Sequence, residues 1–127
     1  MENGDDMQYG KSCCFSGHRP AKLPWGYNER DPRCVEFKKK LDAVIGAVYA
    51  SGIKHFICGM ALGCDLYCAE SVLSLKRAHS DVTLQAAVPY RGQAGAWGEA
   101  NRRRYEEILR RCDEVTVLSE SYTPSCM

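Results

Sequence analysis

Four short apolar runs divide the chain into segments of alternating hydrophobic pattern. The runs are SCCFSG (12–17), KHFIC (54–58), VTLQAAVP (82–89) and EVTVLS (114–119). Short runs of β-branched and small apolar residues that end at a glycine, a proline or a polar loop are typical of buried strands. We therefore predict four strands, with loops after Gly17, Cys58, Val88 and Leu118.

The interval after the first run predicts a helix with well-marked ends. Asp31 is placed as the N-cap and Pro32 as the first helical residue, and Gly52 ends the helix. Its apolar positions recur at helical spacing: Phe37, Leu41, Val44, Ile45 and Val48.

Two further helices are predicted, from Asp65 to near His79 and over residues 99–111. Each has one apolar face. The faces are formed by Leu66, Ala69, Val72 and Leu73 in the first and by Tyr105, Ile108, Leu109 and Cys112 in the second.

The order strand, helix, strand, helix, strand, helix, strand predicts an α/β fold. Nearly continuous apolar strands favour a parallel sheet with right-handed crossovers. We expect a three-layer Rossmann-like domain with about four parallel strands flanked by helices. With 127 residues the chain is long enough for one domain, which we assign to residues 12–127 after a flexible N-terminal segment at 1–11.

Charge and hydropathy exclude some function classes. The 17 basic and 16 acidic residues nearly cancel, which argues against a dedicated basic binder of nucleic acid. The N-terminus has no signal-peptide pattern, and no apolar run approaches the ~18 residues of a membrane span. We expect a cytoplasmic protein without a membrane partner.

The eight cysteines are predicted to be reduced and mostly buried. Several lie in or beside apolar strands and helices, where a thiol packs as a small hydrophobic group. No C-x-x-C pair is present, so we predict neither a zinc site nor a thioredoxin-type motif.

The segment CGMALGCDLYCAE (58–70) joins the second strand to its helix and predicts an anion site. Gly59 and Gly63, with Met60 between them, allow the backbone and the helix N-terminus to approach a phosphate. Asp65 is favoured as the N-cap, although its carboxylate could instead accept from a ribose hydroxyl. The pattern is neither a Walker loop nor a G-x-G-x-x-G fingerprint.

The first loop, SGHRP (16–20), adds further candidate ligand contacts. Ser16 and Gly17 can approach a ligand closely, and Arg19 can bind a phosphate or carboxylate through two hydrogen bonds. His18 is either a general acid or base or a residue that only holds the turn.

The third loop and the last helix supply residues with two interpretations each. Gln93 and Trp97 can bond to and stack on a base, and Trp97 alternatively packs in the core. The arginines of NRRRYEEILRR (101–111) are predicted to form same-helix ion pairs with glutamates on a solvated face.

Four segments together resemble the YpsA-like family of the SLOG superfamily: CCFSGHRPAKLPWGY, FICGMALGCDLYCAESVLSLK, LQAAVPYRGQAGAW and RRYEEILRRCDEV. The superfamily includes the LOG phosphoribohydrolases and DNA-processing protein A. The resemblance implies a Rossmann-like fold and a nucleotide-derived ligand such as NAD or ADP-ribose. Positions that match the family's pattern are Gly17, His18, Arg19, Gly59, Gly63, Asp65, Glu70, Gln93, Trp97 and Tyr105.

The chain departs from that pattern at two places. Tyr90 and Arg91 stand where the family more usually has a small residue and an acid, which adds positive charge at the pocket rim. Family members also continue past YTPSCM into another strand and a glycine-threonine loop. We expect a truncated domain whose fourth strand is an open sheet edge, and we predict self-association through that edge.

Three functions follow from these patterns. We favour a nucleotide-binding sensor or regulatory domain over a catalyst. The resemblance to LOG proteins suggests an N-glycosidic hydrolase with His18, Arg19 or Glu70 as catalytic candidates. The resemblance to DNA-processing protein A suggests a binder of single-stranded DNA, against which the near-neutral charge argues.

Overall fold

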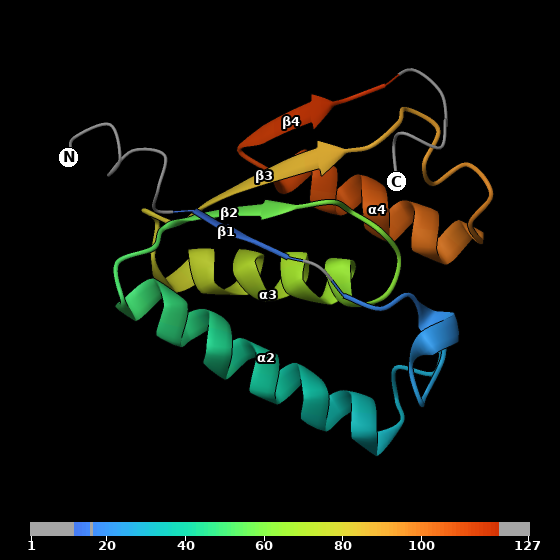
Figure 1. Cartoon of the computed structure of the whole chain (residues 1–127), viewed down its shortest axis with the longest axis horizontal. Helices are drawn as coiled ribbons and strands as arrows, with labels where there is room; N and C mark the ends of the chain where they lie inside the picture. Colours follow the sequence, from blue (N-terminus) through green and yellow to red (C-terminus); the bar gives the residue numbers. More distant parts are fainter. Residues whose placement is uncertain (1–11, 16, 120–127) are drawn as a thin grey trace.

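The computed structural model describes residues 12–15 and 17–119 and contains one parallel sheet with helices between its strands. Figure 1 shows the strands in the order β1-β2-β3-β4, which is also their order in the sequence. The strands are β1 (Ser12–Cys14), β2 (His55–Cys58), β3 (Thr83–Val88) and β4 (Glu114–Val117). The helices are η1 (Pro20–Lys22), α2 (Pro32–Ala50), α3 (Cys64–Ala78) and α4 (Glu99–Arg111).

The predicted α/β fold is confirmed: four parallel strands are flanked by helices in the Rossmann-like manner. All three strand pairs are parallel, with Phe56 opposite Leu84 and Ala86 opposite Val115. Each crossover between neighbouring strands contains one of the three α-helices. None of the described helices combines the length and the apolar character that crossing a bilayer requires.

Helix α2 has the predicted ends. The Asp31 side chain accepts a hydrogen bond from the Arg33 backbone N–H at 2.8 Å, and Pro32 is the first helical residue. After the helix, Gly52 adopts φ +109°, a conformation that favours glycine. Of the predicted apolar face, Ile45 is 2% exposed but Val44 is 58% exposed, because α2 packs mainly against α3 and buries only a narrow stripe.

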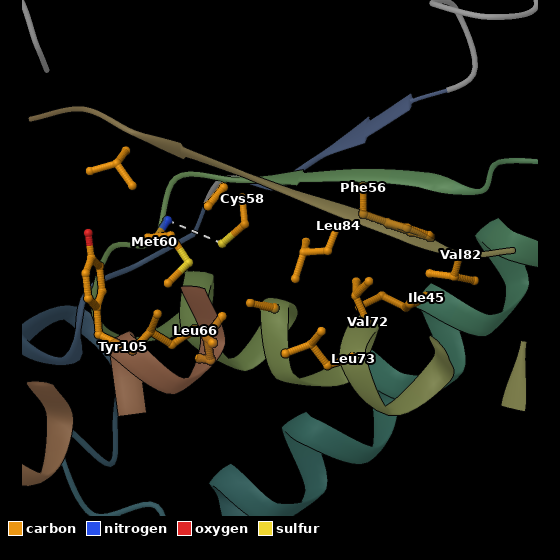
Figure 2. Packing of buried hydrophobic residues seen from close by; sticks show 14 of the residues in the cluster. Ile45, Phe56, Cys58, Met60, Leu66, Val72, Leu73, Val82, Leu84 and Tyr105 are labelled. Atoms are coloured by element: carbon orange, nitrogen blue, oxygen red, sulfur yellow. Dashed lines mark hydrogen bonds between the residues drawn. The ribbon is translucent and has the colours of Figure 1, made fainter. Parts of the chain in front are cut away.

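The larger of two hydrophobic clusters lies between the sheet and the helices (Figure 2), and the smaller one contains Cys34, Cys64 and Tyr67. Alternate residues of β2 and β3 point to this side, as the two-residue period of a strand requires. Figure 1 shows α3 between the sheet and α2. The core contains Phe56, Cys58, Leu84, Ala86 and Val88 from the strands, and Ile45, Leu66, Val72, Leu73, Tyr105 and Ile108 from the helices.

The other face of the sheet carries polar side chains that bond to one another across three strands. The His55 ring nitrogens lie 2.7 Å from Thr83 Oγ1 and 3.1 Å from Gln85 Oε1. Gln85 Nε2 donates to Thr116 Oγ1 at 3.3 Å. This face is half-buried. Separately, β4 forms one edge of the sheet, and its residue Val115 is 46% exposed.

The described cysteines are free thiols. Cys34, Cys58, Cys64 and Cys68 are buried, whereas Cys14 is exposed. No group of three or more His, Cys, Asp or Glu side chains within residues 12–15 and 17–119 could hold a metal ion.

Candidate functional site

A cavity of about 500 Å³ lies at the carboxyl ends of the parallel strands. Ligands bind at this edge in open parallel sheets. The loops after β1, β2, β3 and β4 all contribute to it. Its lining residues are Arg19, Pro20, Ala21, Tyr27, Gly59, Ala61, Leu62, Asp65, Ala87, Pro89, Tyr90, Gln93, Trp97 and Leu118.

Asp65 does not cap α3, and this sequence-based prediction is wrong. The helix begins at Cys64 with Gly63 at the N-cap position, so Asp65 lies inside the first turn. Its Oδ2 accepts a hydrogen bond from the backbone N–H of Ala61 at 3.2 Å. The reason is the conformation of Gly63, which turns the chain into the helix two residues earlier than the side-chain preference suggested.

The carboxylate of Asp65 is buried and lines the cavity. Burial raises its pKa above the ordinary value, although the Ala61 N–H and the charge of Arg19 act in the opposite direction. A Cβ atom on residue 59 would lie 3.3 Å from Asp65 Oδ2. Gly59 therefore leaves room for the carboxylate to stand between the loop and the helix.

Gly17 and Gly63 lie against protein atoms and not in the cavity lining. Gly63 has φ +99°, and a Cβ atom added there would lie 2.7 Å from the His18 carbonyl oxygen. A Cβ atom added at Gly17 would lie 2.4 Å from Cys64 Cβ. The Cys64 N–H also donates to the His18 carbonyl at 3.1 Å. These two glycines let the first loop pack onto the start of α3.

The backbone donors of the glycine loop are partly used within the protein. Met60 is fully buried with φ +65°, and its N–H donates to Cys58 Sγ at 3.3 Å. The Ala61 N–H is bonded to Asp65. Among the described residues nothing accepts from the N–H of Leu62, which belongs to a residue of the lining. Met60 itself packs in the core and does not line the cavity.

Of the first-loop candidates that the structure describes, which are Gly17, His18 and Arg19, only Arg19 lines the cavity. His18 is exposed and contributes its backbone carbonyl to the contact with Cys64. Ser16 lies outside the described residues. The structure thus places a single side-chain cation of this loop, Arg19, on the same cavity as the Asp65 carboxylate.

The third loop contributes both predicted residues to the lining. Gln93 is buried, and its Nε2 donates to the Gly59 carbonyl at 3.2 Å while its Oε1 accepts from the Tyr105 hydroxyl at 3.1 Å. Trp97 packs edge-on against Tyr105, with ring centroids 5.2 Å apart. Trp97 therefore packs against the core and also lines the cavity.

The sequence did not predict Tyr27 as a lining residue. It is 69% exposed and lies in the irregular segment before α2. Its only signal is its position in LPWGY, an aromatic next to a glycine in a loop. Tyr90, noted as a departure from the family pattern, also lines the cavity.

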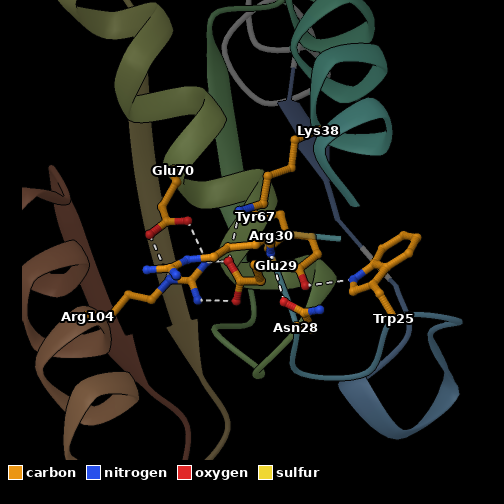
Figure 3. Close-up of polar contacts among 8 residues, drawn as sticks. All are labelled: Trp25, Asn28, Glu29, Arg30, Lys38, Tyr67, Glu70 and Arg104. Atoms are coloured by element: carbon orange, nitrogen blue, oxygen red, sulfur yellow. Dashed lines mark hydrogen bonds and ion pairs between the residues drawn. The ribbon is translucent and has the colours of Figure 1, made fainter. Parts of the chain in front are cut away.

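Glu70 lies outside the cavity and pairs with Arg104 of α4 (Figure 3). Nε and Nη2 of Arg104 each donate to one carboxylate oxygen of Glu70 at 2.7 Å. Of the same-helix ion pairs predicted with Glu106 and Glu107, the pair of Arg110 with Glu107 is present, and Arg103 pairs instead with Glu99 of the same helix. Arg104 differs, because its partners Glu29 and Glu70 lie on other segments.

Comparison with known sequences agrees with this architecture. The sequence profile of YpsA, described as the YspA SLOG family, matches residues 13–126. The chain belongs to this family. The resemblance stated from the sequence is therefore confirmed.

Relatives of the YpsA family found among curated proteins bear the name UPF0398. One, UPF0398 protein BH1768 of Halalkalibacterium halodurans, is 32% identical over 65% of this chain and 44% of its own length. Another, from Bacillus thuringiensis strain Al Hakam, is 31% identical over 87% of this chain and 59% of its own length. The chain spans about half the length of these relatives.

Proposed function

We propose that this YpsA family member binds a nucleotide or nucleotide derivative, such as NAD or ADP-ribose, in the cavity at the carboxyl ends of its strands, and that it acts as a sensor or regulatory domain. One observation carries the proposal: a carboxylate, a guanidinium and an indole, from Asp65, Arg19 and Trp97, line the same cavity. These groups match the three parts of a nucleotide, which are the ribose, the phosphate and the base.

The carboxylate is suited to the ribose. Acidic side chains accept hydrogen bonds from ribose hydroxyls in dinucleotide-binding folds, and Asp65 presents such a group to the cavity from the first turn of α3. Asp65 is held by Ala61 through one oxygen, Oδ2. Each carboxylate oxygen has two lone pairs, so Oδ1 and part of Oδ2 remain as acceptors.

The guanidinium is suited to the phosphate. Arg19 is exposed at the mouth of the cavity and offers paired N–H donors. The Leu62 N–H is the backbone donor that the glycine loop adds. The negative charge of Asp65 repels a phosphate, so the phosphate is expected near Arg19 and the ribose near Asp65.

The aromatic lining is suited to the base. Trp97, Tyr27 and Tyr90 contribute to the walls, and aromatic rings bind bases by stacking. A cavity of about 500 Å³ is within the range of roughly 300–1,000 Å³ that is usual for small-molecule and cofactor sites.

The structure does not favour a hydrolase that uses Glu70 in this cavity. Glu70 lies outside the lining and is bonded to Arg104. Asp65 is the one carboxylate that lines the cavity within the described part of the chain. A catalyst in this cavity would therefore depend on Asp65, which the experiment below also tests.

Calorimetric titration of the full chain with ADP-ribose, NAD and AMP tests the proposal. We expect binding of at least one of them, weakened about tenfold or more by Arg19→Gln and by Asp65→Asn because each removes a charged hydrogen-bond partner. Arg102→Gln is the matched control, since Arg102 is exposed and outside the lining.

Absence of binding at millimolar concentrations of all three ligands would refute the proposal. Chromatography of the same mixtures distinguishes a binder from an enzyme. Release of a free base that Asp65→Asn abolishes would replace the sensor with a hydrolase.

A further inference from the structure

Two consecutive residues of α4 are each bonded to a different wall of the cavity, although neither lines it. One wall is the segment before α2, and the other is the loop after β3. Arg104 bonds to the segment before α2, and Tyr105 bonds to the loop after β3. We infer that Arg104 and Tyr105 are positioning residues that fix the two walls relative to each other.

Arg104 joins two carboxylates from distant parts of the chain (Figure 3). Besides its two bonds to Glu70, its Nη1 and Nη2 donate to Glu29 at 2.7 and 3.1 Å. The Arg104 side chain is only 18% exposed. An arginine that satisfies two carboxylates in a poorly hydrated place is a strong constraint, because its loss removes the Arg104 pair of Glu70 and leaves Glu29 with Lys38 alone.

Glu29 belongs to the segment of residues 20–31, which we call the α2-leading segment. This segment contributes Pro20, Ala21 and Tyr27 to the cavity lining. Lys38 also donates to Glu29, at 2.8 Å. Burial opposes ionisation of Glu29, but the bonds from Arg104 and Lys38 outweigh it and hold the pKa below the ordinary value.

Tyr67 of α3 forms the surface on which this contact is built. The Arg104 guanidinium and the Lys38 ammonium lie 5.7 and 4.7 Å from the centre of its ring. The Tyr67 hydroxyl accepts from Trp25 Nε1 at 3.1 Å. The α2-leading segment is thus attached at Trp25 and at Glu29, on either side of the lining residue Tyr27.

Tyr105 attaches the opposite wall. Its hydroxyl donates to Gln93, which in turn donates to the Gly59 carbonyl, and its ring supports Trp97. Because Arg104 and Tyr105 are neighbours on one rigid helix, the positions of both walls depend on the same turn of α4. Any effect of these residues on a ligand is indirect, since neither lines the cavity.

Hydrogen exchange of the free protein tests the role of Arg104 without a ligand. In Arg104→Met, we expect amide exchange within residues 20–31 to rise about tenfold or more, while the β2 and β3 amides keep their protection. Arg103→Met is the matched control, because the Arg103 ion pair with Glu99 is exposed and lies within α4. Unchanged exchange in residues 20–31 would overturn the inference.

Glu29→Gln provides a second variant in case Arg104→Met does not fold. It removes the carboxylate on the segment but leaves the Arg104–Glu70 pair, so faster exchange should be confined to residues 20–31. Arg104→Lys keeps the charge but not the paired donors and should fall between wild type and Arg104→Met. Equal exchange in all of these variants and wild type would contradict a positioning role.

The two tryptophans of the chain report the walls separately. With Trp97→Phe as background, Trp25 fluorescence reports the wall that Arg104 holds; with Trp25→Phe, Trp97 reports the wall that Tyr105 holds. We expect Arg104→Met to increase acrylamide quenching of Trp25, and Tyr105→Phe to increase quenching of Trp97. Equal changes at both tryptophans in each variant would indicate general loosening and would overturn the assignment of one wall to each residue.

A ligand measurement extends the inference and rests on the proposed function. If wild type binds ADP-ribose, Arg104→Met should weaken binding about threefold to thirtyfold and Arg103→Met should not. Unchanged affinity of Arg104→Met would overturn the inference. Absence of binding by wild type would refute the proposed function, while hydrogen exchange would still decide the positioning role.

Discussion

The carbonyl oxygen of His18 lies 2.7 Å from the point that a Cβ atom on Gly63 would occupy. Pro20 Cδ is 3.0 Å from the same point, and Gly63 has φ +99°. Space and backbone conformation therefore both require glycine at residue 63. The contact brings the loop after β1 onto the N-terminus of α3 and so forms one side of the cavity.

Gly63→Ala is expected to destabilise the protein by about 2–4 kcal/mol, because an L residue is strained at this φ and its Cβ would collide with backbone atoms. Urea denaturation measures the loss. Gly46→Ala in α2 is the control: nothing lies within 4 Å of its added Cβ, so helix propensity should increase stability by about 0.5–1 kcal/mol. Similar values for the two substitutions would contradict this account of Gly63.

Asp65→Asn is expected to increase stability at neutral pH while it weakens ligand binding. Burial raises the Asp65 pKa in the folded protein, so the folded state holds its proton more strongly than the unfolded chain does. The charged carboxylate then costs stability above that pKa, and this cost disappears as the pH falls through it. Denaturation at several pH values should show the advantage of Asn at pH 7 and its loss in acid.

Asp113→Asn is expected to change stability at neutral pH in the opposite direction to Asp65→Asn. Burial of Asp113 is outweighed by bonds from Lys76 and from the Leu84 N–H, so its pKa is lowered. Ionised Asp113 therefore stabilises the folded protein at neutral pH, and this stabilisation is lost as the pH falls through the lowered pKa. Asp113→Asn should reduce stability at pH 7. The same sign for Asp65→Asn and Asp113→Asn would show that the burial of Asp65 is not what governs its titration.

The Asp31 cap of α2 should titrate in strong acid. Hydrogen bonds from the Arg33 side chain and backbone lower the Asp31 pKa to about 2, so its stabilising effect is present above the unfolded value and lost as the pH falls toward 2. Asp31→Asn keeps the cap and should abolish this pH dependence, whereas Asp31→Ala should shorten the helix at all pH values. Carboxyl NMR titration with a midpoint near 4 would disprove the prediction.

Alkylation should separate the thiols by burial. Cys14 is exposed, and Cys58 is buried with its pKa raised mainly by burial, so iodoacetamide should modify Cys14 readily and Cys58 only after unfolding. Mass spectrometry of the native and urea-treated protein shows which of the two cysteines is modified first. Rapid native modification of Cys58 would mean that the β2 end of the core opens easily.

Local sequence was sufficient for most of the secondary structure. Asp31 and Pro32 marked the start of α2, and the predicted helix at 99–111 has the bounds of α4. These elements are predictable because capping and periodicity act within a few residues. Asp65 was misassigned because Gly63 set the start of α3, and the conformation of Gly63 depends on its contact with the loop after β1.

The candidate site was predictable in its location more than in its residues. The carboxyl ends of parallel strands follow from topology, and Arg19, Gly59, Asp65, Gln93 and Trp97 do line the cavity. His18, Gly63 and Glu70 do not: Gly63 packs against the backbone of His18, and the Glu70 side chain is bonded to Arg104 of α4. Tyr27 was missed, since an exposed loop aromatic has no periodic pattern to mark it.

The sequence by itself determined the α/β order and the parallel sheet, because these depend on hydrophobic period and strand connection. Only the tertiary structure decided which side chains meet. Arg104 illustrates the difference: a basic helix predicts same-helix pairs, but packing places Glu29 and Glu70 from two other segments within 2.7 Å of its guanidinium. Contacts between residues 75 positions apart arise from packing of the whole fold, which no local pattern contains.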